Sequence, residues 1–92
     1  MHKMRAVITV IGRDAVGIIA NTSAILSHSN VNILDINQSV YADIFAMVMF
    51  ADISESTVPF AELQKQLEAE GNRLGVVIHA MHEDIFRAMH EI

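Results

Sequence analysis

The hexapeptide Gly-Arg-Asp-Ala-Val-Gly, residues 12–17, places two glycines around an arginine and an aspartate, between two apolar runs. Glycines at a strand-to-helix junction leave backbone N–H groups accessible. The first amides of a helix also carry a partial positive charge that attracts small anions. Asp14 is placed to cap the start of the helix through its carboxylate. The stretch therefore fits the close approach of a ligand to these amides, and a structural turn with a capped helix fits the same residues equally well.

The other side chains that could do chemistry are histidines, of which the chain has five. His79 and His82 are three residues apart on an expected strand, so they point to opposite faces and cannot easily share a metal ion. His82, Asp84 and His90 would converge only if the C-terminal segment folded back. Because no recognised metal-ligand spacing appears and the chain has no cysteine, we expect no metal, cofactor or disulfide.

The composition limits the class of protein. Ninety-two residues suffice for one domain, placed at residues 1–92, with one modest hydrophobic core. The formal net charge is −5 and the six lysines and arginines are scattered, so we expect no nucleic acid partner. The first apolar run reaches Gly12 and Arg13 too soon for a signal or membrane segment. We therefore expect no membrane partner and a cytoplasmic location.

Hydrophobic periodicity predicts four strands and three helices in the order β-α-β-β-α-β-α. The expected elements are strand Met4–Gly12, helix Gly17–Ser29, strand Val31–Val40, strand Ile44–Ile53, a helix that has Pro59 in its first turn and ends at Gly71, strand Leu74–His82, and a tail helix after it. With right-handed crossovers, this order predicts an α+β, ferredoxin-like βαββαβ sandwich. Its four-stranded antiparallel sheet would carry two helices on one face, plus the short C-terminal helix.

Three residues at the ends of these elements have specific expected roles. Gly12 lets the chain turn out of the first strand, and Asn30 suits the left-handed position that ends the first helix. Gly17 in the first helical turn costs about 1 kcal/mol relative to alanine. Close packing of the helix on the sheet, or the approach of a ligand, should offset that cost.

The segment Val7–Val40 resembles the first half of an ACT domain, a small-molecule-sensing module. It is similar to stand-alone ACT proteins and to the ACT domains of the glycine cleavage system regulator and formyltetrahydrofolate deformylase. The matching residues are Gly12, Asp14, Gly17, Ile18, Asn32 and Ile33. Ala15 and Val16 depart from the pattern, since Arg-Pro is common at these two positions, and Arg13 could partly substitute for that arginine.

The resemblance implies regulatory binding of an amino acid or similar metabolite at an interface between two domains, without catalysis. Carried over position by position, it implies a ligand wall formed by Arg13, Asp14, Ala15, Val16, Gly17 and Ile18, faced by Asn32 and Ile33. Helix amides would hold a carboxylate, and Asp14 or Asn32 would meet an ammonium group. The structural alternatives are a helix cap for Asp14 and a strand-edge hydrogen bond to backbone for Asn32.

The expected third strand is apolar on both faces, whereas the two main helices of this fold cover one face of the sheet. Phe45, Met47 and Met49, or their neighbours Ala46 and Val48, should therefore lie on the open side. Covering these side chains with a second subunit would remove apolar area from water, so we expect a homodimer.

Two other functions stay open. The first is a structural protein-interaction module that binds no ligand. The second is an acylphosphatase-like hydrolase, in which residues 12–17 would cradle a phosphate and Asn37 would position a water molecule. Within the regulatory function itself, the domain could act as a dimeric sensor or through a partner protein.

Overall fold

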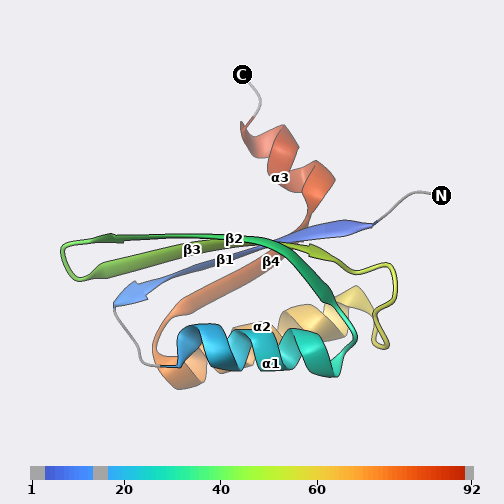
Figure 1. Cartoon of the computed structure of the whole chain (residues 1–92), viewed down its shortest axis with the longest axis horizontal. Helices are drawn as coiled ribbons and strands as arrows, with labels where there is room; N and C mark the ends of the chain where they lie inside the picture. Colours follow the sequence, from blue (N-terminus) through green and yellow to red (C-terminus); the bar gives the residue numbers. More distant parts are fainter. Residues whose placement is uncertain (1–3, 14–16, 91–92) are drawn as a thin grey trace.

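The computed structural model describes residues 4–13 and 17–90 and confirms the predicted α+β, ferredoxin-like fold. The elements are β1 (Arg5–Arg13), α1 (Ile18–His28), β2 (Asn32–Tyr41), β3 (Ile44–Asp52), α2 (Phe60–Leu74), β4 (Val77–His82) and α3 (Glu83–His90). The strands form one antiparallel sheet in the order β2-β3-β1-β4. Helices α1 and α2 lie side by side on one face of it (Figure 1).

The hydrophobic core lies between the sheet and the pair of helices α1 and α2. Its largest fully buried side chains include Ile8, Leu26, Met47, Met49, Leu63, Leu67 and Ile78. On β3, alternate residues beginning with Phe45 are buried in this core, and those beginning with Ala46 are only half-buried. Ala46 and Val48 therefore face the open side of the sheet, which is the second of the two orientations that the sequence allowed for this strand.

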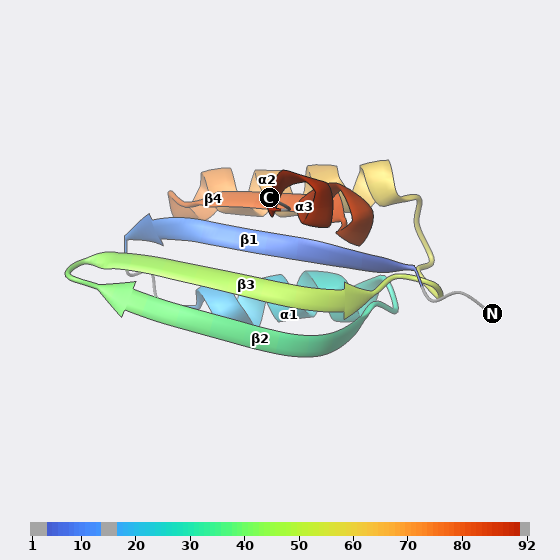
Figure 2. The same ribbon diagram turned by 90° about the horizontal axis from the view of Figure 1, so that it is seen from above.

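Helix α3 lies on the opposite face of the sheet, above β1 and β4 (Figures 1 and 2). Val7 alternates with core residues and so points away from α1 and α2, yet it is fully buried. The ring of Phe86 meets that of Phe50 edge to face, with centroids 6.2 Å apart. The sequence predicted this helix but not its position, and α3 covers one end of the face that was expected to be bare.

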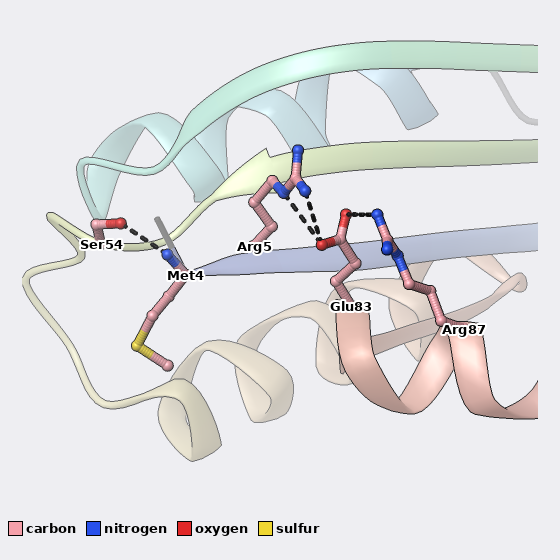
Figure 3. A network of polar contacts seen from close by, with 5 residues as sticks. All are labelled: Met4, Arg5, Ser54, Glu83 and Arg87. Carbon is pink, nitrogen blue, oxygen red and sulfur yellow. Dashed lines mark hydrogen bonds and ion pairs between the residues drawn. The ribbon is translucent and has the colours of Figure 1, made fainter. Parts of the chain in front are cut away.

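An ion-pair network fastens α3 to the beginning of β1 (Figure 3). Arg5 Nη2 lies 2.9 Å from Glu83 Oε1, and Arg5 Nε donates a 3.1 Å hydrogen bond to the same oxygen. Arg87, one turn further along α3, places Nη2 3.8 Å from Glu83 Oε2. Nearby, the main-chain N–H of Met4 donates to Ser54 Oγ. Glu83 thus pairs with Arg5 of β1 and with Arg87 of its own helix, and these contacts orient α3 on the sheet.

The end of α1 follows the sequence prediction. Asn30 has a left-handed φ of 59°, its N–H donates to Ser27 O, and the N–H of Val31 donates to Leu26 O. These two bonds form a Schellman motif, which satisfies helix carbonyls that would otherwise lack partners. The predicted role of Asn30 is therefore confirmed.

The end of α2 differs from the prediction, because Gly71 does not close the helix. The helix continues to Leu74 and ends at Gly75, whose φ is 76°, with the N–H of Val76 donating to Gly71 O. The last strand consequently begins at Val77 rather than at Leu74. Gly71 is instead buried inside the helix, where an added Cβ would lie 2.8 Å from Val76 O.

Gly12 also has a different role from the one predicted. It lies within β1, opposite Phe45, so it makes no turn. An added Cβ would lie 2.4 Å from Val76 Cγ1 and 3.1 Å from Val76 Cα. A glycine is required there because the chain entering β4 crosses directly over β1.

Edge strand β2 is exposed along its length except for half-buried Ile33. Its register against β3 is interrupted between Ile33 and Asp35, so that Leu34 is an extra residue in a β-bulge. The Asp35 carboxylate accepts a hydrogen bond of 2.9 Å from the main-chain N–H of Ile36.

We predict that Gly12→Ala lowers the free energy of unfolding by about 1–3 kcal/mol, because the new methyl group overpacks against Val76. Urea denaturation measures the loss. In the double variant with Val76→Ala, the two losses should be less than additive by at least about 0.5 kcal/mol, since the substitution removes Cγ1, the nearest clashing atom at 2.4 Å, although it keeps Cβ at 2.7 Å. Strict additivity would contradict the proposed contact.

Thr22 offers a second stability test. It is fully buried on α1, and its Oγ1 has no hydrogen-bond partner among the described residues. Replacing the hydroxyl with a methyl group of similar size removes an unsatisfied polar atom, so Thr22→Val should raise the free energy of unfolding by about 1 kcal/mol. Thr57→Val, at an exposed position, is the control and should change it by less than about 0.5 kcal/mol. A destabilised Thr22→Val would show that the hydroxyl is bonded.

Candidate functional site

The junction between β1 and α1 presents two of the predicted ligand residues at one end of the sheet. Arg13 is the last residue of β1, and its side chain is largely exposed. Its Nε lies 3.5 Å from Asp43 Oδ2, an ion pair between two exposed groups. Such pairs contribute little to stability, so the guanidinium can exchange this partner for a ligand carboxylate at small cost.

Gly17 precedes α1 as its N-cap residue and has a φ of 90°. An added Cβ would touch only Asn21 Nδ2, at 3.6 Å, so close packing is not the reason for a glycine here. The left-handed backbone is the reason, since it favours a residue without a side chain. The expected role of Gly17 in close packing of the helix on the sheet is therefore replaced by a conformational role.

The first turn of α1 keeps the electrostatic character expected of an anion site. Gly17 makes no side-chain cap, and the first turn contains no acidic residue, so the helix's own described residues leave its positive end uncompensated. Ile18, the first helical residue, is buried in the core. Its side chain anchors the helix start rather than lining an open surface.

A carboxylate from α2 lies beside this helix start. Asn21 donates a side-chain hydrogen bond to Glu70, which also pairs with Arg73 one turn further along α2. The hydrogen bond from Arg73 is the largest cause that lowers the pKa of Glu70 below its ordinary value of 4.5, and the Asn21 bond acts in the same direction. The same pairing raises the pKa of Arg73.

The other two predicted residues, Asn32 and Ile33, open β2 and border a polar groove. The groove has a volume of about 360 Å³ and is lined by Ser23, Ser27, Asn30, Val31, Asn32 and Ile33. Asn32 is exposed, whereas Ile33 packs against the core. Asn30 Nδ2 donates to Glu55 O across the rim. Hydroxyl and amide groups dominate this surface, which suits a neutral or zwitterionic polar group.

The structure places the two predicted halves of the ligand wall at opposite ends of α1. Arg13, Gly17 and Ile18 lie where the helix begins, and Asn32 and Ile33 lie just past its end. Eleven helical residues span about 16 Å. One chain therefore does not bring the halves together, and a site that unites them needs a second copy turned end for end.

Asp14, Ala15 and Val16 lie outside the described residues, so their part in the wall stays a prediction. Sequence reasoning missed Ser23, Ser27 and Asn30 as lining residues of the groove. A signal for two of them was present, because serines four residues apart share one face of a helix.

The remaining candidate residues do not gather into a second site. His79 is exposed and pairs with Thr9 on the open face, whereas His82 lies on the helix side with its ring 4.3 Å from that of Phe60. The described part of the chain contains no group of three histidine, cysteine, aspartate or glutamate side chains placed to hold a metal. Asn37 pairs with Val48 on β3, and Arg13 pairs with Ile44 on the same strand. These two positions of β3 are four residues apart, which is about 13 Å.

Comparison with known proteins agrees with this fold. The family model described as "ACT domain" matches residues 4–81, which is most of the chain. The chain therefore belongs to the ACT domain family. It is 50% identical over 88 residues to a UPF0237 protein of Methanocaldococcus jannaschii, covering 96% of this chain and 98% of that one.

Solved structures extend the similarity. An ACT domain protein from Streptococcus pneumoniae has a TM-score of 0.79 at 36% identity, covering 97% of this chain and all of that one. A protein assigned as a glycine cleavage system transcriptional repressor has a TM-score of 0.75 at 20% identity, over 89% of this chain and 47% of that one. A formyltetrahydrofolate deformylase from Burkholderia mallei has a TM-score of 0.77 at 12% identity, over 86% of this chain and 28% of that one. The last two share the fold, and the predicted resemblance is confirmed.

None of the helices within the described ranges is long and apolar enough to cross a membrane.

The contact of Glu70 with Arg73 and Asn21 predicts a pH dependence. Because the folded-state pKa of Glu70 is lowered, its ionised form stabilises the fold above the unfolded pKa of about 4.5, and this contribution is lost as the pH falls through the folded value. Glu70→Gln should therefore be slightly less stable than wild type at pH 7, and the difference should shrink as the pH falls below 4.5 and Glu70 becomes protonated. Thermal unfolding across this range measures the difference, with exposed Glu68→Gln as control. A difference that stayed constant with pH would contradict the assignment.

Proposed function

We propose that this chain is a non-enzymatic regulatory domain that binds an amino acid or a similar small organic anion as a cytoplasmic homodimer. The observation that carries the proposal is the β1–α1 junction. There, a left-handed Gly17 opens a helix whose first turn has no acid, and Arg13, with its guanidinium loosely paired to Asp43, ends the strand before it. Membership of the ACT domain family supports the same role.

In this proposal the ligand carboxylate sits against the first amides of α1, where the helix dipole favours negative charge. Arg13 adds a charge-assisted hydrogen bond. Asn32 and Ile33 of a second copy close the site, because within one chain they lie at the far end of α1. Binding would then stabilise the dimer as well as the monomer fold, which is how the domain could report a metabolite to a partner protein.

We predict that at least one ligand from a panel of amino acids, organic acids and nucleotides raises the melting temperature of the purified protein. A ligand at a hundred times its dissociation constant stabilises a one-site protein by about 2.7 kcal/mol. Arg13→Gln should lower the affinity for that ligand by about tenfold or more, because the variant lacks the charged hydrogen-bond donor. Lys65→Gln, which removes the same charge from an exposed position on α2, should leave affinity unchanged.

The same experiment separates the alternatives. A shift lost equally in both variants would indicate bulk electrostatics rather than a site at Arg13. No shift with any compound would favour a protein-interaction module without a ligand. Hydrolysis of an acyl phosphate by the pure protein would favour the acylphosphatase-like alternative and contradict the non-enzymatic assignment.

A further inference from the structure

A small cavity lies at the end of the sheet far from Arg13, where the start of β1 meets the loop between β3 and α2. Its volume is about 150 Å³, and it is lined by Met4, Ile53, Ser56, Val58, Phe60 and His82. Met4 precedes β1 and Arg13 ends it, so the two residues are about 30 Å apart. The cavity is therefore separate from the site in the proposed function.

The loop that forms one wall of the cavity is held by hydrogen bonds within the chain. The N–H of Ile53 donates to the carbonyl of the residue before β1 at 2.8 Å, and the N–H of Thr57 donates to Ser29 O at 2.9 Å. The Ser56 hydroxyl donates to Val58 O and accepts from the N–H of Val58. These bonds tie the loop to β1 and to the end of α1, so the walls of the cavity are in place without a ligand.

Most of the lining is apolar, with one polar side chain left over. None of the six lining residues is an aspartate, glutamate, lysine or arginine, and the Ser56 hydroxyl is already engaged by Val58. His82 is half-buried, and its ring nitrogens have no hydrogen-bond partner among residues 4–13 and 17–90. A neutral imidazole has one N–H donor and one acceptor nitrogen. The cavity thus offers an apolar enclosure with one polar contact.

The size of the cavity and the nature of its walls favour one aromatic ring. An apolar cavity of about 150 Å³ accommodates a benzene molecule. The rings of Phe60 and His82, with centroids 4.3 Å apart and an interplanar angle of 34°, form an aromatic wall on which a third ring can pack. A well-held buried water needs about three polar partners, whereas this lining offers one side chain. Water is therefore a weak competitor for the space.

Met4 lies at the mouth of the cavity. It is 53% exposed, whereas Ile53 in the wall is 8% exposed. Figure 3 shows the Met4 side chain on the opposite side of the strand from Arg5, which pairs with α3. A methionine side chain is flexible, and its sulfur makes favourable contacts with aromatic rings. Met4 can therefore move to admit a ring and then contact it.

We propose that this cavity is a second ligand site, which takes a small uncharged aromatic molecule that bears a hydroxyl group and has the size of phenol. The ring of the ligand lies against Phe60 and the loop, and its hydroxyl forms a hydrogen bond with a ring nitrogen of His82. Because the site is at the far end of β1 from Arg13, it is independent of the site for an amino acid or organic anion. Arg13→Gln should therefore leave this second site intact.

Phenol and benzene, titrated separately into methyl-labelled protein, test the site by NMR. We expect the Met4 methyl signal to shift saturably with either probe, with dissociation constants in the millimolar range that suits so small a ligand. The methyl group of Met89, 65% exposed on α3, is the internal control and should not shift. Unsaturated shifts of equal size at both methyl groups would show non-specific contact and overturn the proposal.

The variant His82→Phe keeps a ring beside Phe60 and removes the two nitrogens. It should weaken phenol by about tenfold, because the hydroxyl then has no partner in an apolar enclosure, and change the affinity for benzene by less than about twofold. His79→Phe, at an exposed position on the other face of the same strand, is the matched control and should change neither affinity. An equal loss for both probes, or no loss, would show that His82 does not bind the hydroxyl and would overturn the proposal.

Filling the cavity tests its location. Val58→Phe enlarges a half-buried side chain of the wall and should abolish the Met4 shift, whereas Val40→Phe, at an exposed position of β2, should not. Circular dichroism verifies that both variants are folded, and His82→Phe still decides if Val58→Phe is not. Undiminished binding in folded Val58→Phe would overturn the proposal, as would binding that appears only when residues 1–3 are deleted, since the start of the chain would then be the occupant.

The two sites fail separately. Absence of phenol binding together with Arg13-dependent binding of an amino acid or organic acid would refute this second site alone. Phenol binding at Met4 without any Arg13-dependent ligand would support the second site and refute the proposed function alone. Loss of phenol binding in Arg13→Gln would contradict the independence of the two sites.

Discussion

Burial of β1 on both of its faces is the constraint on which the rest of the structure depends. Its two edges pair with β3 and β4. One face, with Ile8 and Val10, completes the core beneath α1 and α2, and the other, with Val7, is covered by α3. Gly12 extends the same constraint to the strand's end, because it lets the chain entering β4 cross at van der Waals distance. Because its two neighbouring strands and the buried first half of its length fix its path, β1 holds Arg13 in a defined position at the edge of the fold.

The candidate site uses that fixed position and a locally unusual backbone. The left-handed Gly17 begins α1 and makes no side-chain cap, and the first turn of the helix contains no acidic residue. The buried Ile18 prevents the helix start from shifting. In the proposed function, the core supplies the rigidity of this site and the backbone supplies its polarity for a small anion. The separation of Asn32 from this point by the length of α1 is the reason that the proposal uses a second chain.

Much of the fold could be predicted from the sequence because its signals are local. Alternation on β3, the apolar spacing of α1 and the asparagine at position 30 each determine structure within a few residues. Gly12 and Gly71 were misassigned because their role is tertiary: both make room for the segment around Val76, which is distant in sequence. The position of α3 was missed for the same reason, since Phe86 and Glu83 find their partners only after the sheet has formed. For the site, residue types at the junction were informative, whereas the distance between its two halves depends on helix geometry.

The bulge in β2 bears on how far another strand could add to this edge of the sheet. A ten-residue outer strand with free main-chain donors and acceptors is a template onto which another strand could add without limit. The extra residue at Leu34 breaks the regular spacing of those groups and increases the local twist, and Asp35 places a charge at the same point. A strand approaching from outside would find its hydrogen-bonding register interrupted after a few residues. One irregularity in a strand therefore opposes open-ended growth at this edge, whatever the net charge of the chain.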